Sequence, residues 1–379
     1  MIGWMVLAVL LVWLAVILVR ACLYRPLPAE KVSAAPVAVD EEGAAARLQA
    51  LIRLKTVSYP DAAREDAQAF ADFQQLLCAQ YPHVTESCPR EIIGRRGMLY
   101  RWQGRSDRAP SVLMAHYDVV PVNEGEWHFP PFDGAIRNGE LWGRGTLDTK
   151  GTLHGVMEAA EALIAEGFVP ENDVYFAFGG DEEVFGGDAP AIVAELEKRG
   201  IHPAFVLDEG GAIVENVFPG VSRKAALIGT AEKGAACADL IATGKGGHAS
   251  APAREQTLGI LSRALCRVQN HAMPFTMTPP AREMFDILGR ESSFGYRVLF
   301  ANLWCFRPLL NLVCRLSGGE MNALVRTTCA LTMAEGSKAY NVLPAVAKAG
   351  VNLRVISGDT MDDTCRRLEK IIRDPRVEV

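Results

Sequence analysis

The sequence lacks the cysteine pairs and the basic excess that mark several common classes of protein. Its nine cysteines include no C-x-x-C pair and their number is odd, so neither a disulfide framework nor a thiolate zinc site is expected. Lysine and arginine total 39 against 45 aspartate and glutamate residues, a net charge of −6. This acidic balance argues against a nucleic-acid-binding protein, which would carry a basic face.

Phosphate-binding glycine motifs are also missing. No G-x-x-x-x-G-K-[ST] spacing occurs and no G-x-G-x-x-G follows the first predicted strand, which disfavours a nucleotide-binding α/β domain. Disorder is excluded because 49% of the 379 residues are hydrophobic. A chain of this length has room for two domains.

Charge is absent from Ile2 to Val19, an almost wholly apolar run that ends at Arg20. A run of this length reaches the lower limit for crossing the hydrocarbon core of a bilayer. No lysine or arginine precedes it, and Ala21-Cys22 is a poor cleavage context, which favours an uncleaved anchor over a signal peptide. We predict a single-pass N-terminal membrane anchor over residues 1–22, followed by a Pro- and Ala-rich linker over residues 23–43.

Predicted strands and helices alternate over residues 44–226. This alternation predicts an α/β fold with a mostly parallel sheet and helices on both of its faces. The predicted buried strands are the short apolar runs 111–115, 173–178 and 204–207.

Acidic or imidazole residues follow each of these strands. The first is followed by His116-Tyr117-Asp118, the second by Asp181-Glu182-Glu183 and the third by Asp208-Glu209. Because ligands of such sheets bind at the carboxyl ends of the strands, we expect these groups to converge on one edge.

Residues 227–379 show a different order of predicted elements, β-α-β-β-α-β, which is the split-βαβ sandwich. Between its first helix and its second strand lies an insertion, roughly residues 272–321. The stretches 298–306 and 309–313 within it are too apolar for an ordinary exposed loop. We therefore predict a smaller α+β domain that carries a hydrophobic insertion.

Each polar cluster is ambiguous when it is taken alone. His116 with Asp118 fits a zinc ligand oriented by a carboxylate, but a lone histidine at a strand end is more often structural. The pair Glu182-Glu183 offers a metal ligand and a general base, or only a solvated acidic turn, and Asp208-Glu209 has the same ambiguity. Asp148 follows a glycine-rich turn, from which its two oxygens can bridge two metals.

Together the clusters resemble the co-catalytic zinc aminoacylase and carboxypeptidase family, which includes carboxypeptidase S, aminoacylases and succinyl-diaminopimelate desuccinylase. The resemblance extends from about residue 45 to the end. It is strongest to the membrane-linked carboxypeptidase S and N-acyl-amino-acid hydrolase branch, which also has an N-terminal hydrophobic segment and a hydrophobic insertion in the small domain. The matching runs are LMAHYDVVPV (113–122), WGRGTLDTKG (142–151), DEE (181–183), DEGG (208–211) and NALVRTT (322–328).

The resemblance implies a zinc-peptidase-type mixed sheet flanked by helices, with the β-α-β-β-α-β domain inserted as a lid. It also implies two Zn²⁺ ions, with Co²⁺ or Mn²⁺ as alternatives, and a metal-activated water that attacks the amide bond. Asp118 would orient His116, and Glu182 would be the general base toward that water. The implied metal ligands are His116, Asp148, Glu183 and either Asp208 or Glu209.

Lid residues are implied in the same way. His248, within the run 244–252, resembles a lid histidine that donates to the oxyanion. Asn341 and Arg354 resemble groups that hold the carboxylate of a peptide or N-acyl amino acid substrate, with ordinary turn and surface roles as the alternative. In many relatives such groups come from a second subunit, so a homodimer through the lid is a further expectation.

One element of the family has no counterpart in this sequence. The family carries a second terminal histidine ligand after the lid, whereas the only histidine after His248 is His271, in the region of the first lid helix. We therefore expect residues 44–226 to be a first catalytic segment, the second segment to be absent, and the 379-residue chain alone to be incomplete. The expected function is hydrolysis of an amide or peptide bond next to a free C-terminal amino acid. The alternative is a truncated, non-catalytic relative that binds a metal or an amino acid.

Overall fold

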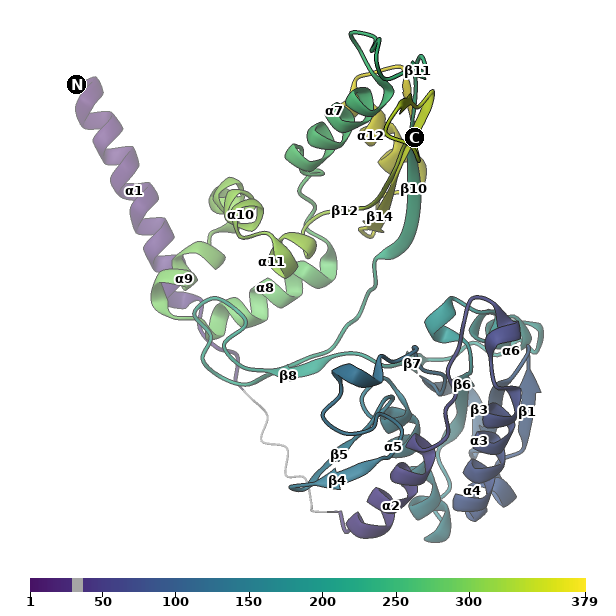
Figure 1. The fold of residues 1–379 in the computed structure, drawn as a ribbon. Helices are drawn as coiled ribbons and strands as arrows, with labels where there is room; N and C mark the ends of the chain where they lie inside the picture. The colour runs from purple at the N-terminus through teal and green to yellow at the C-terminus, as the bar shows by residue number, and fades with distance from the viewer. Residues whose placement is uncertain (29–36) are drawn as a thin grey trace. The chain divides into compact units, whose positions relative to one another are not determined.

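The computed structural model describes residues 1–28 and 37–379, which belong to two compact units (Figure 1). The large-sheet unit is Val32–Gly210, and the small-sheet unit is Met1–Lys31 together with Gly211–Val379. Part of the predicted linker over residues 23–43, namely residues 29–36, lies outside the described residues. The division at Gly210 precedes the predicted domain boundary at residue 226, because Phe218 and Val221 pack in the small-sheet unit.

The large sheet has five strands in the spatial order β1 (Arg90–Ile93), β2 (Gly97–Trp102), β6 (Asn172–Gly179), β3 (Ser106–His116) and β7 (Phe205–Leu207). β3 is parallel to β6 and β7, whereas β2 is antiparallel to β1 and β6. The sheet is therefore mixed, as the family resemblance implied, and the prediction of a mostly parallel sheet was wrong. The prediction failed because of the β1–β2 hairpin. Its antiparallel strands are joined by a short turn without a crossover helix, so an alternation of strands and helices does not predict them.

Helices cover both faces of the large sheet, as predicted. On one face, Phe73 and Leu153 share a core with Tyr100 and Phe178 of the sheet. On the other face, Ile192 packs against sheet residues of a second, smaller core. The first face carries α2 (Glu41–Ile52), α3 (Ala67–Gln80), α4 (Pro82–Ser87) and α5 (Lys150–Ala165), and the second carries α6 (Asp188–Lys198).

The small sheet has four antiparallel strands in the order β12 (Thr328–Glu335), β14 (Val346–Val355), β10 (Gly234–Thr243) and β15 (Val377–Glu378). Two helices, α7 (Thr257–Asn270) and α12 (Met361–Ile372), pack on one face through Ile260 and Leu368. In chain order these elements read β-α-β-β-α-β, the order that the sequence predicted.

The apolar insertion between α7 and β12 is helical. Its helices are α8 (Pro279–Glu291), α9 (Phe294–Phe300), α10 (Leu303–Ser317) and α11 (Gly319–Ala323). Phe285, Phe300 and Leu310 form a core that is separate from that of the small sheet. The N-terminal helix α1 (Ile2–Leu23) meets this insertion at its C-terminal end, as Figure 1 shows.

Short elements connect these layers. Three two-stranded ribbons are formed by β4 (Ala135–Arg137) with β5 (Glu140–Trp142), β8 (Ala212–Val214) with β9 (Ala225–Leu227), and β11 (Gly247–His248) with β13 (Val342–Leu343). The 3-10 helices in the described part of the chain are η1 (Ala62–Arg64), η2 (Glu124–Glu126) and η3 (Glu182–Val184).

Candidate metal centre

Three neighbouring strands bring the candidate residues to one edge of the large sheet. β3 ends at His116, β6 ends shortly before Glu182-Glu183, and β7 ends directly before Asp208-Glu209. Because β6 and β7 both run parallel to β3, their carboxyl ends meet at the same edge. The convergence expected from the sequence is therefore a consequence of the strand order.

His116 lies at the centre of this cluster. Its ring is buried, and its Nε2 atom is 2.9 Å from Asp148 Oδ1, 3.2 Å from Glu209 Oε2 and 3.9 Å from Glu182 Oε2. Two sets of three side chains have potential ligand atoms within 4.8 Å of one another: His116 with Asp148 and Glu183, and His116 with Glu182 and Glu209. The sheet edge thus gathers one imidazole and four carboxylates.

Asp118 lies beneath the cluster and is fully buried. It accepts hydrogen bonds from the Ser58 hydroxyl at 2.7 Å and from the backbone N–H groups of Glu182 and Glu183 at 3.1 Å each. Its Oδ1 atom is 3.3 Å from His116 Nδ1. One carboxylate therefore ties the orientation of the imidazole to the position of the turn that carries both glutamates.

Electrostatics show an excess of negative charge. Burial alone would lower the pKa of His116, but the hydrogen bond and charge of Asp118 and the charges of Glu209 and Glu182 raise it to about 10. Burial, together with repulsion from neighbouring carboxylates, raises the pKa values of Glu182, Glu183 and Glu209. A donor set of one imidazole and several carboxylates with this charge fits a divalent cation that accepts nitrogen and oxygen ligands, such as Zn²⁺.

The two alternatives after β7 occupy different surroundings. Glu209 reaches His116, and it belongs to one of the two ligand sets. Asp208 accepts a hydrogen bond from the backbone N–H of Glu209 and belongs to neither set among the described residues. The geometry therefore favours Glu209 as the acidic group of this turn.

Two residues that support the site had no role in the sequence analysis. Ser58 reaches Asp118 because Val57 forms a parallel bridge with Val119, a contact for which the local sequence gives no signal. Lys150 follows Asp148 after the cis Asp148–Thr149 peptide, and its ammonium group donates to the carbonyl oxygens of Leu51 and Leu54.

Besides these carbonyl groups, the surroundings of Lys150 include the Phe73 ring, 5.2 Å from its Nζ atom, and the charge of Asp118. Its side chain is fully buried, and this burial lowers its pKa to about 7. The lysine joins the start of α5 to the end of α2.

The candidate lid residues lie in the small-sheet unit. His248 is exposed on β11, where it pairs with Val342 of β13, and Asn341 directly precedes Val342. The Asn341 carbonyl accepts a hydrogen bond from the backbone N–H of Ala249, so the two candidate residues are held side by side. Arg354 is exposed on β14, on the face of the small sheet opposite to α7 and α12.

The fold defines a class of protein with known members. A M20 family metallo-carboxypeptidase from Sulfolobus solfataricus has a similar structure, with a TM-score of 0.60 and 16% sequence identity, covering 88% of this chain and 76% of that chain. The chain belongs to peptidase family M20/M25/M40, whose sequence profile matches residues 112–357. The family predicted from the motifs is thereby confirmed.

The sequence similarity to individual relatives extends over most of the chain. The chain is 37% identical over 342 residues to the "Probable carboxypeptidase S-like 2" of Dictyostelium discoideum, which covers 88% of this chain and 66% of the relative. It is 36% identical over 337 residues to the "N-fatty-acyl-amino acid synthase/hydrolase PM20D1" of Xenopus tropicalis, with 88% and 65% covered. The chain thus spans just under two thirds of the length of these relatives.

Proposed function

We propose that the protein to which this chain belongs is a zinc-dependent hydrolase that cleaves an amide or peptide bond next to a free C-terminal amino acid. The observation that carries this proposal is the convergence on buried His116 of four carboxylates, three that follow β6 and β7 and one from the turn before α5. Membership of a peptidase family and relatives named as carboxypeptidases and acyl-amino-acid hydrolases support it.

In this proposal the cluster holds two divalent cations, Zn²⁺ in the first place and Co²⁺ or Mn²⁺ as alternatives. His116, Asp148 and Glu183 would be ligands, with Asp148 shared between the two ions. Glu209, or Asp208 in its place, would complete the set. When bound, the cations polarise the scissile carbonyl and lower the pKa of water.

Glu182 acts as the general base. Its side chain is half exposed, and it points to the cluster, with Oε2 3.9 Å from His116 Nε2. Burial and nearby carboxylates raise its pKa, which brings it closer to the pH at which a base works best. Glu182 takes a proton from the attacking water and delivers it to the leaving amine.

The lid residues complete the reaction in this proposal. His248 donates a hydrogen bond to the oxyanion, and Asn341 with Arg354 holds the substrate carboxylate. A homodimer formed through the small-sheet unit is one way to bring these groups to the cluster. The alternative is that the lid residues and the cluster of one active site come from the same chain.

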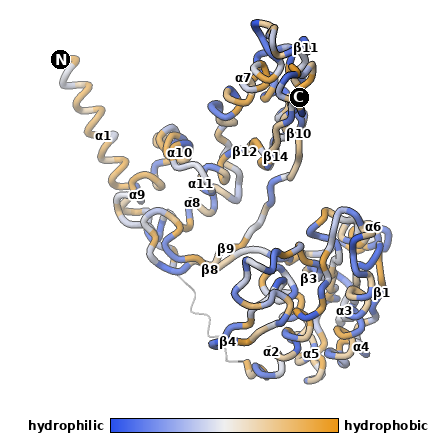
Figure 2. The backbone as a smooth tube through the Cα atoms, viewed as in Figure 1, coloured by the Kyte–Doolittle hydropathy of each residue, from blue (hydrophilic) through white to orange (hydrophobic). Residues whose placement is uncertain are grey.

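We also propose that α1 is an uncleaved membrane anchor. It is long and apolar enough to cross a membrane, a property that anchors share with signal sequences, and Figure 2 shows hydrophobic residues along it. Its C-terminal turns support the anchor, because Ile17 and Ala21 are buried in the small-sheet unit and cleavage would expose their partners. A membrane location suits substrates with a long acyl chain.

The test is hydrolysis of N-acetyl and N-oleoyl amino acids by the natural gene product that contains residues 1–379. The variant Glu182→Gln is expected to lose about 10²–10⁴-fold in kcat while it still binds Zn²⁺. Glu197→Gln, an exposed substitution on α6, is the matched control and is expected to leave both properties unchanged. Zinc binding without hydrolysis of either substrate by the unmodified protein would favour the non-catalytic alternative.

A further inference from the structure

α10 is apolar on two opposite faces. One face packs into the core of the insertion through Leu310 and Cys314. The other face is exposed, with Trp304 at 60% and Leu316 at 79% exposure. Its remaining large apolar residues are Leu309, Leu312 and Val313. A helix at a water-exposed surface carries polar residues opposite its core face, so α10 has the pattern of a helix with an apolar environment on both sides.

The insertion is joined to α1 by polar and apolar contacts. The Asn302 side-chain amide donates to the carbonyl oxygen of Ile17 at 3.1 Å, and the Arg20 guanidinium donates to the carbonyl oxygen of Ala301 at 3.0 Å. The Tyr24 hydroxyl donates to the carbonyl oxygen of Asp286 at 2.7 Å. These contacts tie the last two turns of α1 to α8 and to the turn between α9 and α10.

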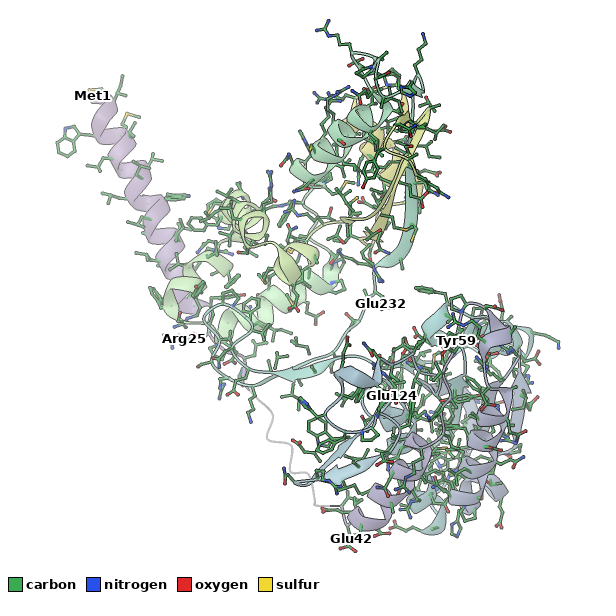
Figure 3. All side chains as sticks on the ribbon, in the orientation of Figure 1. Met1, Arg25, Glu42, Tyr59, Glu124 and Glu232 are labelled. Carbon is green, nitrogen blue, oxygen red and sulfur yellow. The ribbon has the colours of Figure 1, made fainter. Side chains whose placement is uncertain are left out.

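One aromatic contact lies deeper along α1. The ring centroids of Trp13 and Phe306, the latter on α10, are 6.3 Å apart. Trp13 lies inside the uncharged run, seven residues before Arg20, which corresponds to about 10 Å along a helix. If α1 crosses a bilayer, the N-terminal part of α10 is therefore at the depth of the acyl chains. Figure 3 shows Met1 and Arg25 at opposite ends of α1, with the insertion grouped near Arg25.

Charge supports the same environment. Residues 294–317, which form α9 and α10, contain three arginines and no aspartate or glutamate. Arginine side chains at this position can extend to anionic headgroups while their stems stay in an apolar layer. A segment that combines an exposed apolar face with basic side chains as its only charged groups is complementary to an anionic lipid surface.

We infer that α9 and α10 enter the leaflet at the Arg20 end of α1, with the exposed face of α10 against lipid acyl chains. This inference rests on the membrane anchor of the proposed function. The small-sheet unit is then held to the bilayer by a helical platform rather than by a single tether. A long acyl chain of a substrate would leave the membrane next to this platform.

The test uses the full 379-residue chain in vesicles of phosphatidylcholine and phosphatidylglycerol, with and without lipids brominated on their acyl chains. Brominated chains quench tryptophan only on contact. The difference between the parent chain and Trp304→Phe isolates the fluorescence of Trp304, and Trp13→Phe does the same for α1. Trp127→Phe, in the large-sheet unit, is the matched control.

Brominated lipid is expected to remove most of the fluorescence of Trp304 and of Trp13 and none of that of Trp127. Quenching of Trp13 without quenching of Trp304 would overturn the platform and leave the anchor intact. In that case the exposed face of α10 would be covered by protein, such as the large-sheet unit or a second copy, and not by lipid. No quenching of either residue would overturn both. Leu312→Trp places a new fluorophore on the same face, so the inference stays testable if Trp304→Phe folds poorly.

Discussion

The two units differ in how their candidate residues are held. In the large-sheet unit, His116 and Asp118 are buried and fixed by several contacts, and the acidic groups face one another within a few ångströms. In the small-sheet unit, His248, Asn341 and Arg354 are exposed. In the proposed function, the metal-binding groups are therefore pre-positioned within one unit, whereas the proposed lid residues have few contacts that fix them.

The first prediction concerns the stability of the small-sheet unit. Phe285 is fully buried between Phe218 and Phe300, so Phe285→Ala is expected to lower the free energy of unfolding by about 3–5 kcal/mol. Urea unfolding followed by circular dichroism measures this. Zinc affinity is expected to stay unchanged, and a loss of affinity would show that the two units are not independent.

A matched change in the large-sheet unit should affect both properties. Asp118→Ala removes the acceptor of the Ser58 hydroxyl and of two backbone N–H groups, and it leaves His116 unoriented. We expect a loss of about 3–5 kcal/mol in the free energy of unfolding and a loss of zinc binding. Full stability or unchanged zinc affinity in this variant would contradict the role given to Asp118.

A substitution of His248 tests the role proposed for the exposed residues of the small-sheet unit. His248→Ala is expected to lower kcat by roughly 10²–10³-fold, because it removes a donor to the oxyanion, and to leave zinc affinity unchanged. Ser250→Ala removes only the 2.8 Å contact between its hydroxyl and His248 Nδ1 and is expected to have the smaller effect on kcat. A histidine variant with normal kcat would remove the lid residue from the mechanism.

Adjacent carboxylates after β7 give a sharper test of the metal centre. Glu209→Gln is expected to lower zinc affinity by roughly 10–100-fold or more, the scale seen for metal-site partners. Asp208→Asn, one residue away and outside both ligand sets, is expected to bind zinc normally. Calorimetric titration of both variants decides between the two residues, and the reverse order would assign the role to Asp208.

The smallest expected effect depends on pH. Burial lowers the pKa of His154, whose Nδ1 lies 2.7 Å from the Tyr81 hydroxyl. Below its ordinary pKa of about 6.5, the unfolded chain therefore binds a proton that the folded chain does not, and stability falls as the pH is lowered. His154→Gln should show a weaker decline between pH 7 and pH 5 than the parent chain. Equal slopes for the two proteins would rule out this contribution.

Much of the site could be predicted from the sequence because its residues directly follow apolar strands. His116 and Glu182-Glu183 needed only the direction of β3 and β6 to be brought together. The β-α-β-β-α-β order of the small sheet was equally readable, because each element has its own periodicity.

Other features depend on contacts between distant segments. The pairing of β2 with β6, the support of Asp118 by Ser58 and the closeness of Glu209 to His116 all depend on packing that no local pattern encodes. The contact of α1 with the insertion is of the same kind, since it joins residues almost three hundred positions apart. Their hydrophobicity predicted that both segments need an apolar environment, but it did not predict that they contact each other.

The most direct test of the metal centre is zinc binding by the full chain and by Asp148→Asn, measured by isothermal titration calorimetry. The Asp148 side chain is 62% exposed, so its substitution is expected to leave the free energy of unfolding unchanged. The account predicts that the parent chain binds Zn²⁺ and that Asp148→Asn binds it much more weakly. Equal zinc affinity of the two proteins would contradict the assignment of this cluster as a metal centre.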